Sequence, residues 1–173
     1  EGAIDVSAQP IAWIDSKIIN IDPEMVRSVV IEVSGEPTIS VTKTNKSKTL
    51  FTLQDIPEGR KPKSATLMSS FGSLLTDLRF DDVLSSKRLA GAIPIRSATI
   101  RLFDNAEVIL FDYSFRGKVY TKIKIDKPQN GEAIANPKYS KYALNNEHKK
   151  WVYLLPKYKR RILERKFASL VQK

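Results

Sequence analysis

Arg27-Ser28-Val29-Val30-Ile31-Glu32-Val33 returns 69 residues further along the chain as Arg96-Ser97-Ala98-Thr99-Ile100-Arg101-Leu102, identical at three positions. In the first stretch, the residues at every second position are apolar, which is the period of two typical of a strand with one buried face. The inward-facing positions of the second stretch stay in phase with the first. The pair therefore predicts two equivalent strands, each belonging to one copy of a repeated unit.

The first unit continues with more strands and then a helix. Polar turn residues at 34–37 and 45–48 bound a segment that alternates around Ile39 and Val41, and a short apolar run at 50–53 follows. Three antiparallel strands joined by hairpins are expected here. A loop over 55–62, interrupted by two prolines and a glycine, leads to a helix that Ser64 can cap. The apolar side chains that recur at helical spacing are Leu67, Phe71, Leu74, Leu75 and Leu78.

The second unit follows the same order after a connection at 79–94. An alternating strand runs over 119–125, a polar insertion lies between Asp126 and Lys150, and a last strand at 151–155 ends at Pro156. A helix is expected from Lys157 to Val171, and one of its sides carries Ile162, Leu163, Phe167, Leu170 and Val171. The two helices are 93 residues apart instead of 69, and the insertion accounts for the difference.

These patterns predict an α+β fold made of two tandem repeats of antiparallel strands followed by a helix packed on the sheet. The whole chain, 1–173, is expected to form a single domain. Repeat one spans about 25–80, repeat two spans about 96–172, and residues 1–24 form an N-terminal arm.

The positive charge is concentrated near the C-terminal end. The net charge is +10, and the segment from Lys138 to Lys173 carries eleven Lys and Arg against Glu147 and Glu164. Such asymmetry indicates a local anionic partner or a solvated helix face. The residues proposed for an anionic-partner surface are Lys149, Lys150, Arg160, Arg161 and Arg165.

Nucleic acid is a weaker alternative for that partner. Tyr139, Tyr142 and Tyr158 are interleaved with lysines, as in proteins that bind single strands by base stacking and charge. The last helix, however, uses its apolar side in the core, which leaves Arg160, Arg161 and Arg165 as the outward cations.

The sequence contains no recognisable catalytic, metal or cofactor motif. Cysteine is absent, and His148 is the only histidine, set in a segment that reads as a solvated loop. Asp81-Asp82 is the one carboxylate pair, and adjacent residues on an extended chain point apart, so we expect it to end the first helix. The glycines form no phosphate-binding pattern. We predict no catalytic residue, no metal site and no cofactor, and leave open whether a small molecule binds.

Several stretches resemble a known family. Phe51-Thr52-Leu53-Gln54-Asp55-Ile56-Pro57-Glu58-Gly59-Arg60, the segment Leu78-Arg79-Phe80-Asp81-Asp82-Val83, and Trp151-Val152-Tyr153-Leu154-Leu155-Pro156-Lys157-Tyr158-Lys159 are similar to the bacterial domain-of-unknown-function family 4340. Trp13-Ile14-Asp15 and Ile19-Asn20-Ile21-Asp22 add to the resemblance, which covers nearly the whole chain.

The resemblance implies an envelope protein with one N-terminal anchor and its bulk on the periplasmic side of the inner membrane. Some members look like neighbours of gliding-motility-type ABC transport systems. No apolar run reaches the roughly 18 residues that a spanning helix needs, and the chain starts at Glu1, so we expect the anchor upstream. The expected function is a non-enzymatic binding or scaffolding domain with a protein partner in the envelope. The alternative is a basic module that binds anionic lipid or nucleic acid through the C-terminal region.

Overall fold

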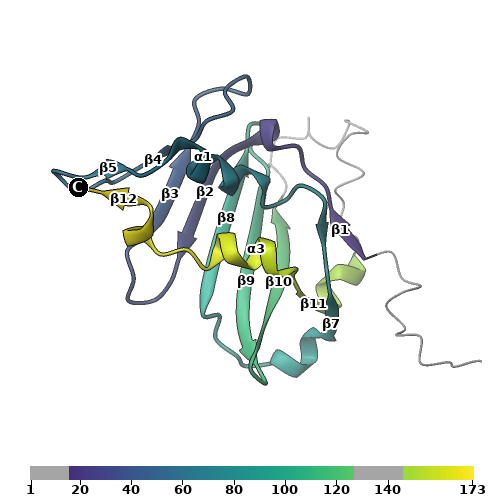
Figure 1. Cartoon of the computed structure of the whole chain (residues 1–173). Helices are drawn as coiled ribbons and strands as arrows, with labels where there is room; N and C mark the ends of the chain where they lie inside the picture. Colours follow the sequence, from purple (N-terminus) through teal and green to yellow (C-terminus); the bar gives the residue numbers. More distant parts are fainter. Residues whose placement is uncertain (1–15, 127–145) are drawn as a thin grey trace, which may run out of the picture.

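The fold is built on one antiparallel sheet of eight strands (Figure 1). The structure is a computed structural model that describes residues 16–126 and 146–173. It has the expected α+β class. In sheet order, the strands are β4 (Thr52–Leu53), β3 (Ile39–Thr42), β2 (Val26–Glu32), β8 (Arg96–Leu102), β9 (Glu107–Phe115), β10 (Lys118–Asp126), β11 (Trp151–Leu154) and β7 (Asp82–Ser85). Trp13, Tyr139, Tyr142 and most of the polar insertion lie outside the described residues.

The two halves of the chain meet in the sheet at the antiparallel pair β2–β8, which is formed by the two stretches that match in sequence. Val29 lies opposite Ile100 and Val30 opposite Thr99. On one side of this pair the chain continues through β3 to β4, and on the other side through β9 to β10. The three hairpin-connected strands expected at 26–53 are confirmed as β2, β3 and β4.

Two short sheets accompany the large one and tie distant segments together. Strand β1 (Lys17–Ile19) pairs with β6 (Leu78–Arg79), and β5 (Lys61–Pro62) pairs with β12 (Val171–Gln172). Strand β7, which follows the first helical segment, pairs with β11, which precedes the second. Conversely, β12 follows the second helical segment and pairs with β5, which precedes the first. Each half of the chain therefore supplies an edge strand to the other half.

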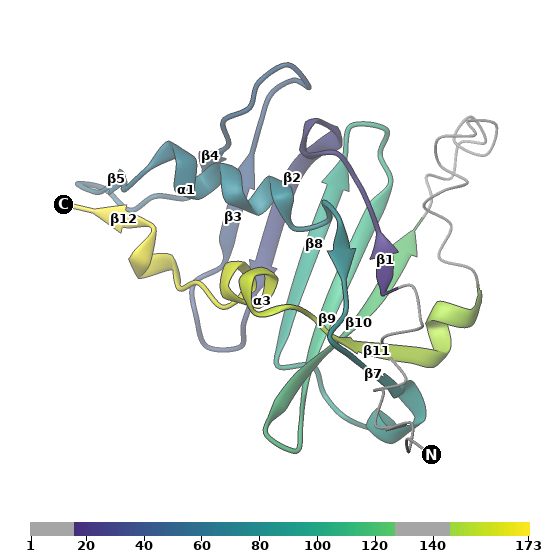
Figure 2. The same cartoon turned by 45° about the vertical axis from the view of Figure 1, so that its right-hand side comes forward.

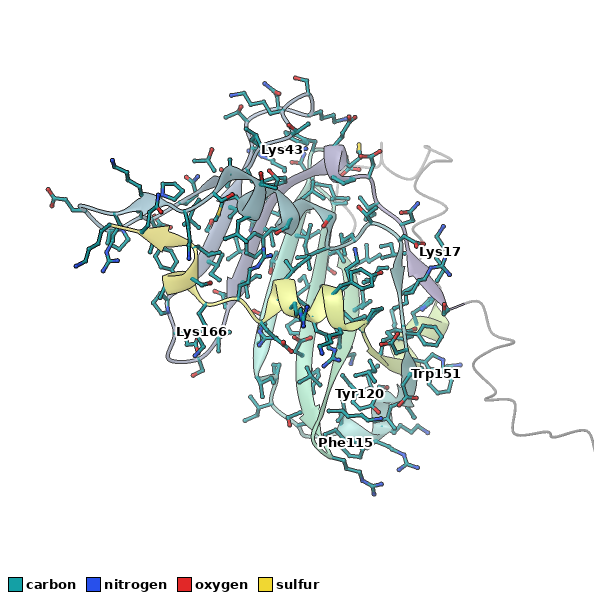
Figure 3. The ribbon with its side chains drawn as sticks, viewed as in Figure 1. Lys17, Lys43, Phe115, Tyr120, Trp151 and Lys166 are labelled. Atoms are coloured by element: carbon teal, nitrogen blue, oxygen red, sulfur yellow. The ribbon has the colours of Figure 1, made fainter. Side chains whose placement is uncertain are left out.

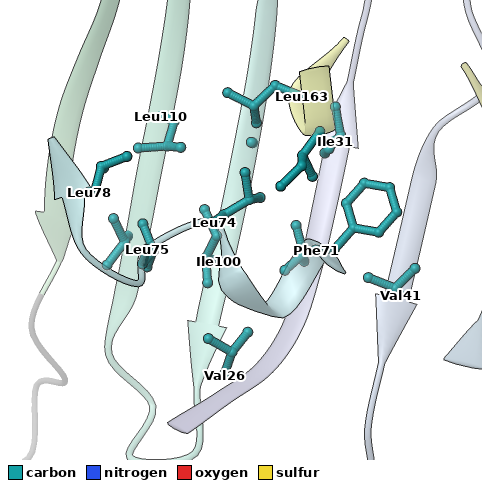
Figure 4. Close-up of a cluster of buried hydrophobic side chains, with 14 of the residues drawn as sticks. Val26, Ile31, Val41, Phe71, Leu74, Leu75, Leu78, Ile100, Leu110 and Leu163 are labelled. Atoms are coloured by element: carbon teal, nitrogen blue, oxygen red, sulfur yellow. The ribbon is translucent and has the colours of Figure 1, made fainter. Parts of the chain in front are cut away.

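The helices lie on the same face of the large sheet (Figures 1 and 2). They are α1 (Ala65–Ser69), which continues into the 3₁₀ helix η3 (Ser70–Ser73), and α3 (Lys157–Leu163). Their buried side chains, among them Phe71, Leu74 and Leu163, meet Ile31, Ile100 and other strand residues in one cluster (Figure 4). Burial of this cluster is the main stabilising term, at roughly 1.5–3 kcal/mol for each large apolar side chain. None of the helices in the described part of the chain has the length and apolar character to cross a bilayer.

The first helix begins as expected but ends early. Ser64 Oγ accepts the backbone N–H of Leu67, which is the predicted N-cap. The helix does not continue to Leu78, however, because α-helical geometry stops at Ser69, and Leu78 belongs to β6. Ser69 and Ser73 donate their hydroxyls to backbone carbonyls three or four residues earlier, a bond that competes with regular helix.

The final helix is also shorter than expected. Helix α3 ends at Leu163 instead of Val171, and the chain then forms the 3₁₀ helix η7 (Phe167–Ser169) before β12. Ile162, Leu163, Phe167 and Leu170 are nevertheless buried. The apolar spacing therefore predicted which side chains point inward. The backbone that carries them, however, does not form one continuous helix.

The segment 79–94 is not a simple connection. It contains β7, and then the 3₁₀ helix η4 (Ser86–Leu89). The expectation that Asp81-Asp82 ends a helix is wrong, because Asp82 starts an edge strand. Asp82 Oδ2 accepts the hydroxyl of Tyr120 at 2.8 Å, which joins β7 to the second strand along the sheet, β10.

Two cations of the C-terminal segment are used inside the fold. Lys159 is buried and donates through Nζ to the carbonyls of Ser73 and Thr76 (2.7 Å to the latter), at the carboxyl end of η3. Arg165 donates to the carbonyl of Leu67 at 3.1 Å and to the hydroxyl of Ser70. Cations at the carboxyl end of a helix satisfy its last carbonyls and complement its dipole. These two side chains therefore fasten the second helical segment to the first.

Replacing Lys159 by Met should expose the importance of this link. Two carbonyls would lose their donor, so we expect the free energy of unfolding to fall by about 1–3 kcal/mol in urea titrations. Lys157→Met is the matched control because Lys157 is exposed on the same helix, and its effect should stay within about 0.5 kcal/mol. Equal effects of the two variants would show that the link adds nothing.

Burial also lowers the pKa of Lys159, to about 8. The unfolded chain then binds this proton up to its ordinary pKa of 10.5 while the folded chain releases it near 8. Between these values, unfolding takes up a proton, so this lysine makes the folded state more stable as the pH rises. Lys159→Met should remove that part of the pH dependence, and NMR of ¹³Cε-labelled lysines should show one resonance titrating near 8 that the variant lacks.

Candidate functional site

The face of the large sheet opposite the helices is only partly covered by the described residues. Strand alternation sends Val30, Thr99, Ile109, Phe111 and Tyr113 to this face, and all five are half-buried. We call it the open face. At one end it is closed by a second cluster whose buried members are Leu89, Tyr120 and Val152. The rest of the face thus presents aliphatic and aromatic side chains that α1, η3 and α3 leave uncovered.

A hollow lies on the open face beside β9 and β10. Its volume is about 410 Å³. The residues that line it come from three elements: Phe111 and Tyr113 of β9, residues 122–126 of β10, and His148 and Lys149 of the 3₁₀ helix η6 (Asn146–Lys150). Antiparallel register places Phe111 directly opposite Lys122 and Tyr113 opposite Tyr120. We call this site the β9–β10 hollow.

The charge around the hollow is positive. Lys122, Lys124 and Lys149 line it, together with one carboxylate, that of Asp126. Lys124 forms an exposed ion pair with Asp126 at 2.7 Å, so these two charges largely offset each other. Aromatic rings next to lysines suit a ligand that carries an apolar group and a negative charge.

His148 borders the hollow and is held by a hydrogen bond. Its Nδ1 lies 2.6 Å from the hydroxyl of Tyr153. Burial raises the pKa of Tyr153 to about 12 and lowers the pKa of His148, so near neutral pH the tyrosine keeps its proton and the imidazole is neutral. The hydroxyl then donates to Nδ1, and the imidazole proton resides on Nε2. His148 is thus half-buried and fastened to a core residue, which corrects the expectation of a solvated loop.

The residues expected to form an anionic-partner surface have different environments. Lys149 and Lys150 are exposed in η6, and Lys149 lines the hollow. Arg161 is exposed on α3, whereas Arg160 is half-buried and donates through Nε to the carbonyl of Leu155 at 2.9 Å. Arg165 is half-buried and bonded to the first helix, as described above. The expectation that both Arg160 and Arg165 point outward is therefore wrong.

Sequence reasoning missed the aromatic and basic residues of the open face. Phe111, Tyr113, Lys122 and Lys124 occupy the positions that alternate with the buried residues of β9 and β10. The sequence carried one indication of them: in the strand expected over 119–125, two lysines occupy the outward positions and alternate with isoleucines. The outward lysines of β10 lie beside the outward aromatic residues of β9. This combination indicates a binding surface more specifically than net charge does.

A second hollow of about 410 Å³ lies near the C-terminus. It is lined by the loop residues Glu36, Pro37, Pro57 and Arg60 and by Lys166, Phe167, Ala168 and Val171. Lys166 Nζ pairs with Glu36 across it at 3.1 Å. This hollow offers a single aromatic ring and charges of both signs. It therefore indicates a particular kind of ligand less clearly than the β9–β10 hollow does.

Asp112 is the most buried carboxylate of the sheet and forms a polar cluster on the covered face. Its Oδ2 pairs with Arg96 at 2.8 Å, and its Oδ1 accepts the hydroxyl of Thr121 at 2.6 Å. Burial raises the pKa of Asp112 although both partners oppose the shift. The carboxylate is 3% exposed, so it has no surface to offer a substrate, and its partners account for both oxygens. This cluster holds β8, β9 and β10 in register.

Removing the guanidinium should therefore be costly and pH dependent. Breaking a buried pair leaves an uncompensated charge, so Arg96→Met should lower the free energy of unfolding by about 3–5 kcal/mol at neutral pH. The loss should shrink on acidification, because Asp112 has a raised pKa in the folded state and takes up a proton before the unfolded chain does.

The control is Arg101→Met on the same strand. Arg101 pairs with Glu107 at 2.6 Å, but its side chain is 60% exposed. An exposed pair contributes about 0–1 kcal/mol, so this variant should change little in urea titrations at either pH. A loss for Arg96→Met that matched the control, or that grew on acidification, would contradict the role given to the cluster.

Over residues 16–126 and 146–173, no group of three or more His, Cys, Asp or Glu side chains is placed to hold a metal ion. The chain matches no protein-family model, no curated protein and no solved structure. The resemblance noted in the sequence therefore stays a prediction.

Proposed function

We propose that this chain is a non-enzymatic binding domain that holds a protein partner against the open face of its sheet. The β9–β10 hollow is the observation that carries the proposal. It combines two aromatic rings with three lysines on the face of the sheet that α1, η3 and α3 do not cover. A hollow with apolar walls and a few charged groups is the usual form of a specific binding site.

The chemistry of the hollow defines the kind of partner segment it would accept. Phe111 and Tyr113 offer ring surfaces for an aliphatic or aromatic side chain. Lys122 and Lys149 offer cations that Asp126 does not neutralise, because Asp126 is paired with Lys124. An acidic segment with one large apolar side chain satisfies both features.

The titratable groups that are buried or half-buried support a binding role over catalysis. Asp112 is enclosed with Arg96 and Thr121, His148 is bonded to Tyr153, and Lys159 donates to helix carbonyls. Each has a partner within the fold. A perturbed pKa marks a catalytic residue only where the group also reaches a substrate.

The cellular setting of the proposal comes from the family resemblance. It favours a bacterial envelope domain on the periplasmic side of the inner membrane, anchored by an N-terminal segment and serving an ABC-transport-type complex. The partner would then be another component of that complex.

We further infer that the two halves of the chain arose by internal duplication. Val29 pairs with Val41 in the first half, and their counterparts 69 residues later, Ala98 and Leu110, pair in the second. Val30 lies opposite Thr99, its own counterpart, so the relation between the halves is a two-fold rotation about this pair. The reciprocal pairing of β7 with β11 and of β12 with β5 agrees with that symmetry.

A photo-crosslinking amino acid at position 111 tests the proposed partner surface. The full-length protein would carry benzoylphenylalanine in place of Phe111 in its native cells, and crosslinked products would be identified by mass spectrometry. We expect one recurrent protein adduct, weakened at least tenfold by a second change, Lys122→Glu, which reverses a charge in the hollow.

The matched control carries the same amino acid at Tyr158. This aromatic residue is 56% exposed on α3, on the opposite face. The control should yield none of that adduct. The proposal fails if position 111 gives no protein adduct, or if both positions give the same set.

A further inference from the structure

The connection between η4 and β8 exposes two isoleucines. Ile93 is 85% exposed and Ile95 is 42% exposed. Pro94 stands between them, and Gly91 has φ +79°, a conformation that favours glycine. Transfer of a fully exposed isoleucine out of water is favourable, so a pair of them at a turn is a specific feature of this surface.

This connection crosses the end of the sheet next to the β9–β10 turn. Leu89, at the end of η4, belongs to the same apolar cluster as Phe115 of β9. Further along, the backbone N–H of Ile95 donates to the carbonyl of Asp112 at 2.8 Å. Both flanks of the connection are therefore fixed to β9, and Figures 1 and 2 show it beside the β9–β10 turn.

The elements beside this connection carry exposed cations. Lys87 and Arg88 are exposed in η4, and Arg116 and Lys118 are exposed at the β9–β10 turn, where Arg116 lies over the ring of Phe115. Figure 3 shows Phe115 at this end of the sheet. The nearby carboxylate of Asp82 accepts the hydroxyl of Tyr120 and lies 3.9 Å from Lys118, so it offsets part of one charge only.

The η6 helix fixes the position of η4. Ser86, at the start of η4, donates its hydroxyl to the carbonyl of Lys149 at 3.3 Å. The backbone of η6 is thereby held beside η4, whereas Lys149 lines the β9–β10 hollow and is not part of the docking surface.

We propose that this end of the sheet docks on an anionic lipid bilayer. The docking surface, called here the isoleucine tip, comprises Lys87, Arg88, Ile93, Ile95 and Arg116. Cations next to anionic headgroups each strengthen binding by roughly fivefold, and apolar side chains then enter the interface between headgroups and acyl chains. Two separate isoleucines on a turn need no preformed pocket in a fluid interface. The charge complementarity therefore favours lipid, and the inference is independent of the protein partner proposed for the β9–β10 hollow.

A single labelled cysteine can report directly on insertion, because the chain has no cysteine of its own. The 173-residue chain with Ile93→Cys, labelled with nitrobenzoxadiazole, would be mixed with phosphatidylcholine vesicles with or without phosphatidylglycerol. We expect a blue-shifted, brighter emission only with the anionic vesicles, and its loss at high salt.

The same label on Leu50→Cys is the first control. Leu50 is 54% exposed and has Lys46 and Lys48 nearby in sequence, so it resembles the tip in composition. Its β3–β4 loop lies at the opposite end of the sheet (Figure 2). The label there should remain in water.

Charge variants test the electrostatic part by vesicle sedimentation. Lys87→Gln with Arg88→Gln should weaken binding roughly 20-fold, since two of the cations are removed. Lys157→Gln with Arg161→Gln removes the same charge from the exposed side of α3 and should weaken it less than about twofold.

The inference is overturned if the chain does not bind anionic vesicles, if the labels at positions 93 and 50 respond alike, or if the two charge variants weaken binding equally. A label at position 93 that shifts only when a protein partner is added would likewise overturn it in favour of a protein contact. Circular dichroism of every variant should match the parent chain, because all these positions are exposed.

Discussion

The pairing of β2 with β8 is the interaction on which the rest of the structure depends. These strands are far apart in sequence, and each begins a run of three hairpin-connected strands in the eight-stranded sheet. Once Val30 lies opposite Thr99, the period of two in every neighbouring strand assigns each side chain to a face. One face then receives the apolar residues that the helices bury, and the other face receives Phe111, Tyr113 and the lysines of β10. The covered core and the candidate binding surface are consequences of one register.

Part of the positive charge is used inside the fold. Lys159 and Arg165 are directed to the carbonyls of the first helical segment, and Lys43 is buried with its Nζ 2.8 Å from the carbonyl of Pro23. Such cations count in the net charge of +10 but are not available to a partner. The exposed charge that matters for binding is instead distributed over β10, η4 and η6, which the sheet brings to the open face and to one end.

Local patterns in the sequence were sufficient for the long strands of the large sheet and for one helix cap. The alternation around Val29, Ile39 and Ile123 predicted buried strand faces, and Ser64 was recognised as an N-cap. The early end of α1 was not predicted. Serine hydroxyls there bond to backbone carbonyls and weaken the helix, although the apolar spacing favours a longer one. Strand β7 was missed for another reason, since its stability comes from pairing with β11, almost 70 residues away. The candidate site was only partly predictable: Lys149 was identified from charge, while Lys122 and Phe111 become a site only when the register places them opposite each other.

The two halves of the chain form one cooperative unit, because β2–β8 joins them and each half supplies an edge strand to the other. Native-state amide hydrogen exchange in increasing urea measures this directly, strand by strand. We expect the slowest amides of β2 and β3 and those of β8 and β9 to exchange with the same free energy and the same dependence on urea, as in a single global unfolding. A first half that opened at a clearly lower free energy and with a smaller urea dependence than the second would contradict the central role of the β2–β8 pair.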